Sequence, residues 1–199
     1  MCGAPVYSGL ALGHVCDACV SAPPAWSRGA AAVAYAGVGR RLVLALKHGD
    51  RLDVAALAAE WMLRAGRPLV DTADLIAPVP IHWRRRIKRR YNQSEELARD
   101  LAAAAGKSET YAPGLLVRSR HTETQDGKNR SARHANVRDA IAVAPSTRTS
   151  LSGKTVLLID DVLTTGATLS ACAEALRDAG AADVNVLVFA RVAREAPPD

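Results

Sequence analysis

Aromatic residues are scarce in this 199-residue chain: they make up 4% of it, and Phe189 is its only phenylalanine. A hydrophobic core must therefore be built mainly from alanine, valine and leucine. The chain is nevertheless 49% hydrophobic and 23% charged, which is typical of a globular protein and excludes an intrinsically disordered one. Its length suits one domain with a sizeable core and a small appendage.

Long hydrophobic runs are also absent, since no stretch approaches the roughly 20 apolar residues that a membrane-spanning helix needs. The N-terminus shows no basic leader followed by an apolar run, so we expect no secretory signal and a cytoplasmic location. Only four cysteines occur, and in that compartment we expect no disulfide. Cys172 falls on the apolar face of an expected helix, where a buried thiol is the simplest interpretation.

Basic residues outnumber acidic ones by 26 to 20, which gives a formal net charge of +6. The excess is local, because the chain outside one short segment is neutral. This segment predicts a site for an anion, either a phosphorylated small molecule or a nucleic-acid backbone; a solvated charged face is the alternative. The basic residues of this segment are Arg84, Arg85, Arg86, Lys88, Arg89 and Arg90.

Short apolar segments alternate with amphipathic ones, a pattern that favours an α/β fold with a parallel sheet. The segment 154–159 is a nearly continuous apolar run, which is expected where a strand is covered on both faces. Residues 118–138 are polar, basic and aperiodic and predict a long loop, a feature that is usually functional or mobile. The expected strands are 30–36, 75–80, 137–143, 154–159 and 183–192, and the clearest helices are 92–105 and the segment after residue 168 that ends at Gly180.

The segment 156–168 contains the most chemistry. Its strand brings Asp160 and Asp161 to the carboxyl edge of the sheet, where open α/β folds bind ligands. Adjacent carboxylates repel unless a cation or hydroxyl donors satisfy them. The residues Thr164–Thr168 are small or hydroxylated and open a helix, so their amides can hold a phosphate. The segment therefore predicts a sugar-phosphate site; the alternative is that the acids form a helix cap and the threonines an ordinary turn.

The same segment resembles the phosphoribosyl-diphosphate (PRPP) motif of the type I phosphoribosyltransferases. Further motifs resemble the ComF family, the competence-associated branch of these proteins, and cover most of residues 40–192. The sequence departs from the family pattern at Arg90, where glycine is usual, and at Lys128, where leucine is usual. The motifs are Leu46-Lys47-x-Gly49-Asp50, Pro78-Val79-Pro80, Asn92-Gln93, Thr122-x-x-Gln125 and Arg133-x-x-Asn136-Val137.

The resemblance implies a type I phosphoribosyltransferase fold over residues 30–199, a mostly parallel twisted sheet flanked by helices. It implies that Asp160 and Asp161 hold the ribose hydroxyls, directly or around Mg²⁺. The 5′-phosphate of PRPP would be bound by Thr164, Thr165, Gly166, Ala167 and Thr168. The pyrophosphate would face Val79, Pro80, Arg84 and Arg85, and a flexible loop would bring Arg118, Arg120, Lys128 or Arg133 to the leaving group.

The implied reaction is displacement of pyrophosphate from ribose C1′ by a nucleophile that the sequence does not identify. Two alternatives remain. The chain is a single-stranded-DNA-binding accessory protein of DNA uptake with a regulatory or vestigial PRPP site, or it is a PRPP-sensing regulator without turnover. A steep salt dependence of DNA affinity would distinguish contact with a phosphate backbone from a compact ligand site.

Residues 1–29 are rich in glycine, proline and cysteine and predict a small zinc-ribbon-like module. Two cysteines spaced as in Cys16-x-x-Cys19 hold one metal ion from a tight turn. Cys2 resembles the last cysteine of an upstream pair. The fourth zinc ligand is then His14 or a residue before Met1; alternatively, the module is degenerate and holds no metal.

Overall fold

The computed structural model describes residues 2–3, 15–48, 52–81, 92–118 and 141–192. At its centre lies a four-stranded sheet in the order β1-β6-β5-β2, with every neighbouring pair parallel. This arrangement confirms the predicted α/β fold and parallel sheet. Its strands are β1 (Gly29–Ala34), β2 (Leu75–Pro78), β5 (Thr155–Leu163) and β6 (Asp183–Arg191).

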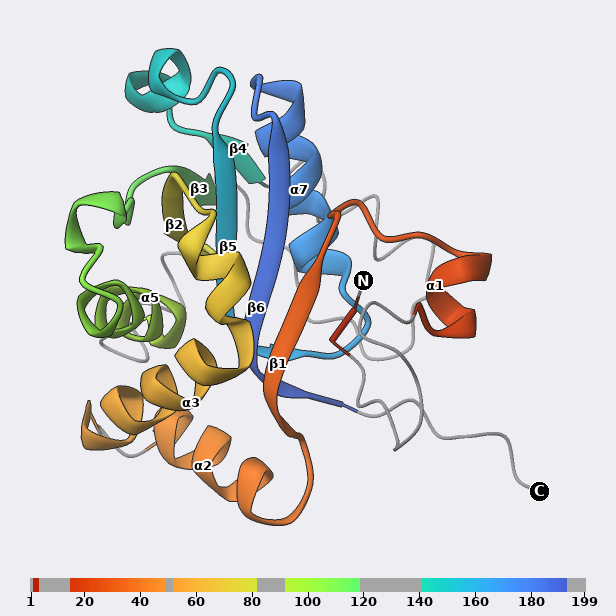
Figure 1. Ribbon diagram of the computed structural model, residues 1–199, viewed down its shortest axis with the longest axis vertical. Coiled ribbons are helices and arrows are strands. Elements are labelled where there is room, and N and C mark those ends of the chain that lie inside the picture. The colour runs from red at the N-terminus through yellow and green to blue at the C-terminus, as the bar shows by residue number, and fades with distance from the viewer. Residues whose placement is uncertain (1, 4–14, 49–51, 82–91, 119–140, 193–199) are drawn as a thin grey trace.

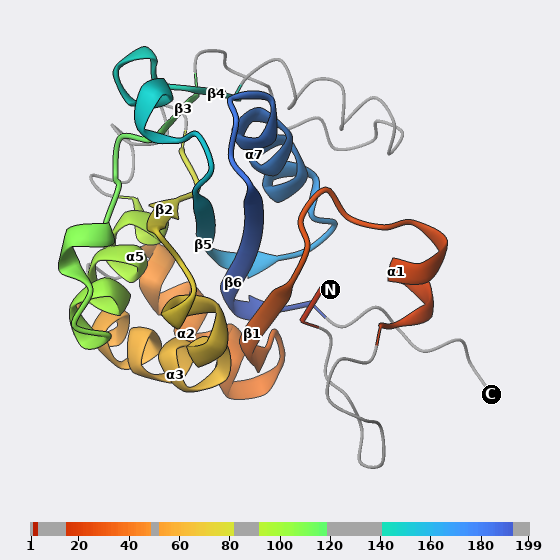
Figure 2. The same ribbon diagram turned by 45° about the horizontal axis from the view of Figure 1, so that its top comes forward.

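Helices cover both faces of this sheet (Figures 1 and 2). One face is covered by α3, which packs on β1 and β6, and by α5, which packs on β5 and β2; α7 covers the other face. Within the described ranges, no helix combines the length and apolar character needed to cross a membrane. The helices are α1 (Asp17–Ser21), α2 (Gly37–His48), α3 (Leu52–Asp71), α5 (Gln93–Ala104) and α7 (Ala167–Asp178).

A second, two-stranded sheet pairs β3 (Leu116–Arg118) with β4 (Ile141–Val143) in antiparallel fashion. The strand predicted over 137–143 is therefore confirmed in its last part. Residues 137–140, and the predicted loop from residue 119 onward, lie outside the described residues. Short 3₁₀ helices occupy Ser108–Thr110 and Pro145–Ser150.

The strand predicted over 154–159 is longer in the structure, because β5 continues through both acidic residues to Leu163. Its pairing with β6 runs on as far as Leu163 opposite Arg191. Backbone pairing with a neighbouring strand thus extends β5 beyond the point where its apolar pattern stops. The two acids consequently lie within the strand rather than in a loop after it.

Alternation along β5 divides the core into two layers. Val156 and Leu158 pack with α7, whereas Leu157 and Ile159 pack with the α3 and α5 side. All four side chains are fully buried. A strand with both faces buried is characteristic of a parallel sheet between helices, and it explains the continuous apolar run in the sequence.

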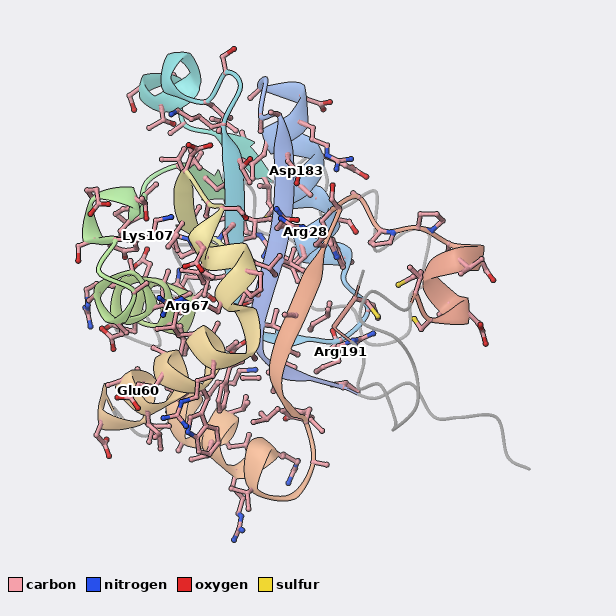
Figure 3. The ribbon with its side chains drawn as sticks, viewed as in Figure 1. Arg28, Glu60, Arg67, Lys107, Asp183 and Arg191 are labelled. Atoms are coloured by element: carbon pink, nitrogen blue, oxygen red, sulfur yellow. The ribbon has the colours of Figure 1, made fainter. Side chains whose placement is uncertain are left out.

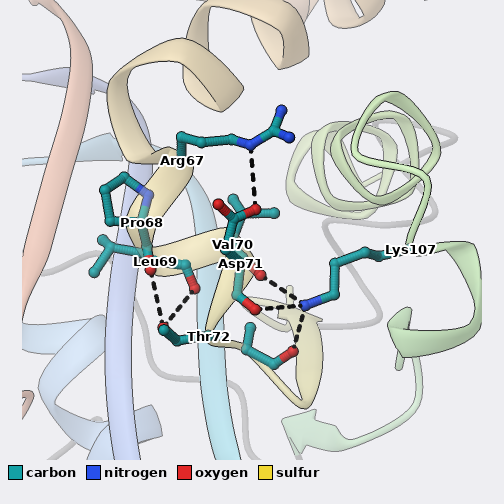
Figure 4. A network of polar contacts seen from close by, with 8 residues as sticks. Arg67, Pro68, Leu69, Val70, Asp71, Thr72 and Lys107 are labelled. Atoms are coloured by element: carbon teal, nitrogen blue, oxygen red, sulfur yellow. Dashed lines mark hydrogen bonds and ion pairs between the residues drawn. The ribbon is translucent and has the colours of Figure 1, made fainter.

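The end of α3 is tied to the segment after α5 by Lys107 (Figure 4). The ammonium Nζ of Lys107 donates hydrogen bonds to the carbonyls of Val70, Asp71 and Ala73 at 2.9, 3.0 and 2.9 Å. The last carbonyls of a helix have no partner within the helix, and a cation there also interacts favourably with the helix dipole. Lys107 therefore fixes the connection that leads into β2.

We expect Phe189→Ala to lower the free energy of unfolding by about 3–5 kcal/mol, the usual range for emptying a buried aromatic position. Phe189 is completely buried on β6, with its ring centroid 6.4 Å from that of Trp61. Phe189→Leu, which retains more of the side-chain volume, should cost less. Urea denaturation measures both variants, and a loss below about 1 kcal/mol for the alanine variant would contradict this packing.

Candidate functional site

Three elements meet at the acid pair of β5. The Asp160 carboxylate oxygen Oδ1 accepts hydrogen bonds from the hydroxyl of Ser94 at 2.8 Å and from the amide of Asp161 at 2.9 Å. Asp161 forms an ion pair with Lys47, with 3.2 Å between Oδ2 and Nζ. Ser94 lies in the first turn of α5 and Lys47 in the last turn of α2. The pair is thus held between two helices at the carboxyl end of the sheet.

The environment of Asp160 disfavours its charged form. Burial, the largest effect, and the negative charge of Asp161 raise the pKa of Asp160 to about 7, although hydrogen bonds from Ser94 and the Asp161 amide and the charge of Lys47 oppose the shift. Such a carboxyl group gains from any ligand that brings positive charge or hydroxyl donors. The alternative prediction, that these acids cap a helix, is wrong: α7 begins after Gly166, and both acids belong to β5.

The predicted phosphate loop lies directly between β5 and α7. Thr164 and Thr165 are exposed, while Gly166 is buried with φ +84°. In the described part of the chain, the backbone amides of Thr165 and Gly166 donate no hydrogen bond. The Thr165 hydroxyl lies 3.4 Å from the Ala167 amide at the start of α7. Amides that are left without an acceptor at a helix N-terminus are suited to an anion.

The ring of Trp26 packs against this loop at Gly166. A Cβ on Gly166 would lie 2.9 Å from Cη2 of the buried Trp26 ring, and the positive φ of Gly166 also disfavours a side chain. Trp26 itself belongs to the buried core cluster that also contains residues of α7. Its contact with the loop was not predictable, because no motif joins the two segments in the sequence.

The predicted pyrophosphate turn is fixed on both sides. The amide of Val79 donates to the carbonyl of Ile159 at 2.9 Å, and the carbonyl of Val79 accepts from Asn92 Nδ2 at 3.2 Å. Asn92 also caps α5, since its Oδ1 accepts from the Ser94 amide at 3.1 Å. Through Ser94, this network joins the turn to Asp160. Pro80 is partly buried beside it, and Arg84 and Arg85 lie outside the described residues.

Of the four predicted loop residues, the structure describes only Arg118, at the end of β3. Its charge lowers the pKa of Cys172, whereas burial, the largest effect, and Asp160 raise it. The expectation of a buried thiol at Cys172 is confirmed. Arg120, Lys128 and Arg133 lie outside the described residues.

Sequence analysis missed two residues that contact the acids. Lys47 belongs to a motif that carried the family resemblance, but no role was assigned to it. Ser94 follows the Asn92-Gln93 motif directly. Each reaches an acid only through the fold, Lys47 from α2 and Ser94 from α5.

The three N-terminal cysteines come together. The Sγ atoms of Cys2, Cys16 and Cys19 all lie within 4.8 Å of one another, and those of Cys2 and Cys16 are 3.6 Å apart. Burial and the two neighbouring thiols raise the pKa of Cys19. Three sulfur donors fit part of a tetrahedral zinc site. His14, a candidate for the fourth ligand, lies outside the described residues.

A family model, the phosphoribosyl transferase domain, matches residues 92–199, which contain the acid pair, the loop and Ser94. The chain belongs to this family. The match covers more than half of the chain and includes β5 and β6, the two central strands of the parallel sheet. Within the family, the chain falls in the ComF branch, because its relatives include a competence protein F.

Two relatives illustrate this position. The DNA utilization protein YhgH of Salmonella typhi is 32% identical over 194 residues, covering 92% of this chain and 82% of that protein. Competence protein F of Haemophilus influenzae is 28% identical over 181 residues, covering 88% and 78%. Among solved structures, an allosteric regulatory enzyme of purine biosynthesis is 24% identical with a TM-score of 0.45, covering 73% of this chain and 30% of that one.

We expect Asp160→Asn to stabilise the protein at neutral and alkaline pH. The pKa of Asp160 is about 7 in the folded protein and about 4 in the unfolded chain, so the folded protein loses stability as pH rises from about 4 to 7. Removing the carboxylate should therefore raise the free energy of unfolding most above pH 7. The gain in the free energy of unfolding should be on the order of 4 kcal/mol at pH 8, which corresponds to a pKa raised from about 4 to about 7, and should vanish toward pH 4.

Denaturant unfolding across this pH range measures the effect. Asp161→Asn is the matched control: it loses the ion pair with Lys47 and should gain less. Equal stability of Asp160→Asn and the unaltered chain at every pH would show that Asp160 is not held in a charge-disfavouring site.

Proposed function

We propose that this chain binds Mg²⁺-PRPP at the carboxyl edge of its sheet and transfers the phosphoribosyl group to an acceptor nucleophile, with release of pyrophosphate. The observation that carries the proposal is that an acid pair and a loop at the N-terminus of α7 lie next to each other on one segment. Asp160 and Asp161 lie near the carboxyl end of β5, and the amides of Thr165 and Gly166, which donate to no described residue, follow directly after the strand. A sugar phosphate has hydroxyls for the first subsite and an anion for the second.

The acid pair is suited to the pentose. Ribose hydroxyls donate hydrogen bonds, and two adjacent carboxylates offer more acceptor positions than Ser94, Lys47 and the Asp161 amide occupy. Carboxylate oxygens are also the ligands that Mg²⁺ prefers, so the donor set fits the ion. Mg²⁺ bound with PRPP would neutralise charge on the pyrophosphate and make it a better leaving group.

The loop is suited to the 5′-phosphate. Its amides and threonine hydroxyls are donors, and the positive end of the α7 dipole favours negative charge. Trp26 packs directly against Gly166 and leaves no room for a side chain at this point of the turn. The phosphate and the pentose would then be held at fixed points, leaving C1′ to face the turn after Val79.

In the transfer step, the bond between C1′ and the pyrophosphate oxygen breaks as a lone pair of the acceptor forms a bond to C1′, and the acceptor then loses a proton. Positive charge develops on the sugar ring during this step. The negative charge of Asp160 and Asp161 is placed to stabilise it, in a site where burial strengthens electrostatic effects. No serine or cysteine nucleophile is required.

DNA binding is a second candidate function, favoured by the names of the relatives, DNA utilization protein and competence protein F. The basic residues 84–90 would contact the phosphate backbone of single-stranded DNA, and the PRPP site would then be regulatory or vestigial. A DNA affinity that falls steeply with salt would support this function. A PRPP-dependent pyrophosphate-release screen over nucleobases, amines and ammonia separates a transferase from a PRPP sensor.

Replacing both acids, by Asp160→Asn with Asp161→Asn, should abolish binding of Mg²⁺-PRPP in a calorimetric titration. The double variant removes the charge that attracts the metal and weakens the acceptors for the ribose hydroxyls. Asp71→Asn, which changes an exposed acid at the end of α3, is the control and should bind normally. Unchanged affinity in the double variant would refute the proposed site.

Metal analysis of the purified full chain under reducing conditions should find about one zinc per chain, held by Cys2, Cys16, Cys19 and a fourth ligand. Cys16→Ser should release it, because it removes a thiolate from the cluster. Cys172→Ser is the matched control, since this thiol lies in the core away from the cluster. A metal-free reduced protein would show that the module is degenerate.

A further inference from the structure

A buried arginine lies behind the loop, at the carboxyl end of β6 (Figure 3). Arg191 is only 4% exposed, and no carboxylate of the described residues lies within ion-pair distance of it. Arginine remains charged under all ordinary conditions, and a buried charge without a counter-ion is strongly unfavourable. The position therefore calls for an explanation beyond packing.

The contacts of Arg191 are directed at the loop. Its Nη1 donates to the carbonyl of Leu163 at 2.8 Å and to that of Thr164 at 2.7 Å. Its Nε is buried and has no acceptor among the described residues. The guanidinium group thus touches the first two peptide groups between β5 and the glycine turn, and part of its hydrogen-bonding capacity is unused.

These contacts determine which way the loop amides face. The carbonyl and the amide of a trans peptide group point in opposite directions, and the described chain has no cis peptide bond. Holding the carbonyls of Leu163 and Thr164 therefore turns the amides of Thr164 and Thr165 away from Arg191. The Thr165 amide is one of those that donate to no described residue.

A purely structural role, in which Arg191 joins the ends of two strands, does not explain why this side chain is charged. The ends of β5 and β6 are already joined by the backbone, because the Val192 amide donates to the Leu163 carbonyl at 3.0 Å. A neutral side chain would fill the same space without burying a charge that no described carboxylate balances. What the charge adds is positive potential behind two peptide groups whose amides face the other way.

We propose that Arg191 is a positioning residue for the phosphate of the bound sugar: it orients the loop amides toward the anion and supplies a buried positive charge behind them. This inference rests on the proposed function, because it assigns a role within the same site. The bound anion in turn provides a negative counter-charge for Arg191, which pairs with no carboxylate of the described residues. The bound phosphate and the guanidinium group thus stabilise each other through the loop, without direct contact.

The test compares two ligands in calorimetric titrations of the full chain: ribose 5-phosphate, which probes the loop, and Mg²⁺-pyrophosphate, which probes the other end of the site. Arg191→Met removes the charge and retains much of the volume. We expect it to weaken ribose 5-phosphate binding about tenfold or more, the effect of losing a charge-assisted interaction, and to leave pyrophosphate binding unchanged. Arg191→Lys keeps the charge without the planar fork and should lie between.

The outcomes separate the inference from the proposed function. If the unaltered chain binds neither ribose 5-phosphate nor PRPP, the proposed function fails and the inference fails with it. If the unaltered chain binds and Arg191→Met binds ribose 5-phosphate equally well, or loses both ligands in equal measure, only the role of Arg191 is refuted. Should Arg191→Met not fold, Arg191→Lys decides: a selective loss of ribose 5-phosphate affinity supports the role, and unchanged affinity overturns it.

Discussion

The site depends on the parallel pairing of β5 with β6. This pairing extends β5 past its apolar segment, so that Asp160 and Asp161 lie on a strand and the loop begins at a fixed point, Leu163 opposite Arg191. The same register places a buried guanidinium group behind the loop. The acid pair, the loop between β5 and α7 and a buried cation therefore derive their positions from one backbone ladder.

Side chains from the neighbouring helices set the electrostatic environment of this edge of the sheet. The hydroxyl of Ser94 and the ammonium of Lys47 partly satisfy the acids, and burial still holds the pKa of Asp160 well above its usual range. Arg191 represents the converse case, a buried cation without a described counter-ion. Each of these buried groups lowers the stability of the folded protein, and such groups are common at binding sites.

The sequence predicted the parts of this site that are contiguous. The acids and the loop are consecutive residues that follow an apolar segment, so their pattern alone indicates their place at the carboxyl edge of the sheet, where the structure has them. The contacts of Lys47, Trp26 and Arg191 join segments that are distant in the sequence, and no local pattern encodes them. The predicted end of the strand at residue 159 was wrong because the acids interrupt the apolar pattern while the ladder with β6 continues.

Hydrogen exchange of the backbone amides, with and without Mg²⁺-PRPP, tests most directly whether an activated pentose phosphate binds at this edge. Exchange slows where amides gain acceptors or become buried. Binding at this site predicts that protection is greatest over residues 160–168, and at Thr165 and Gly166 in particular. Protection confined to other parts of the chain, with exchange at residues 160–168 unchanged, would contradict it.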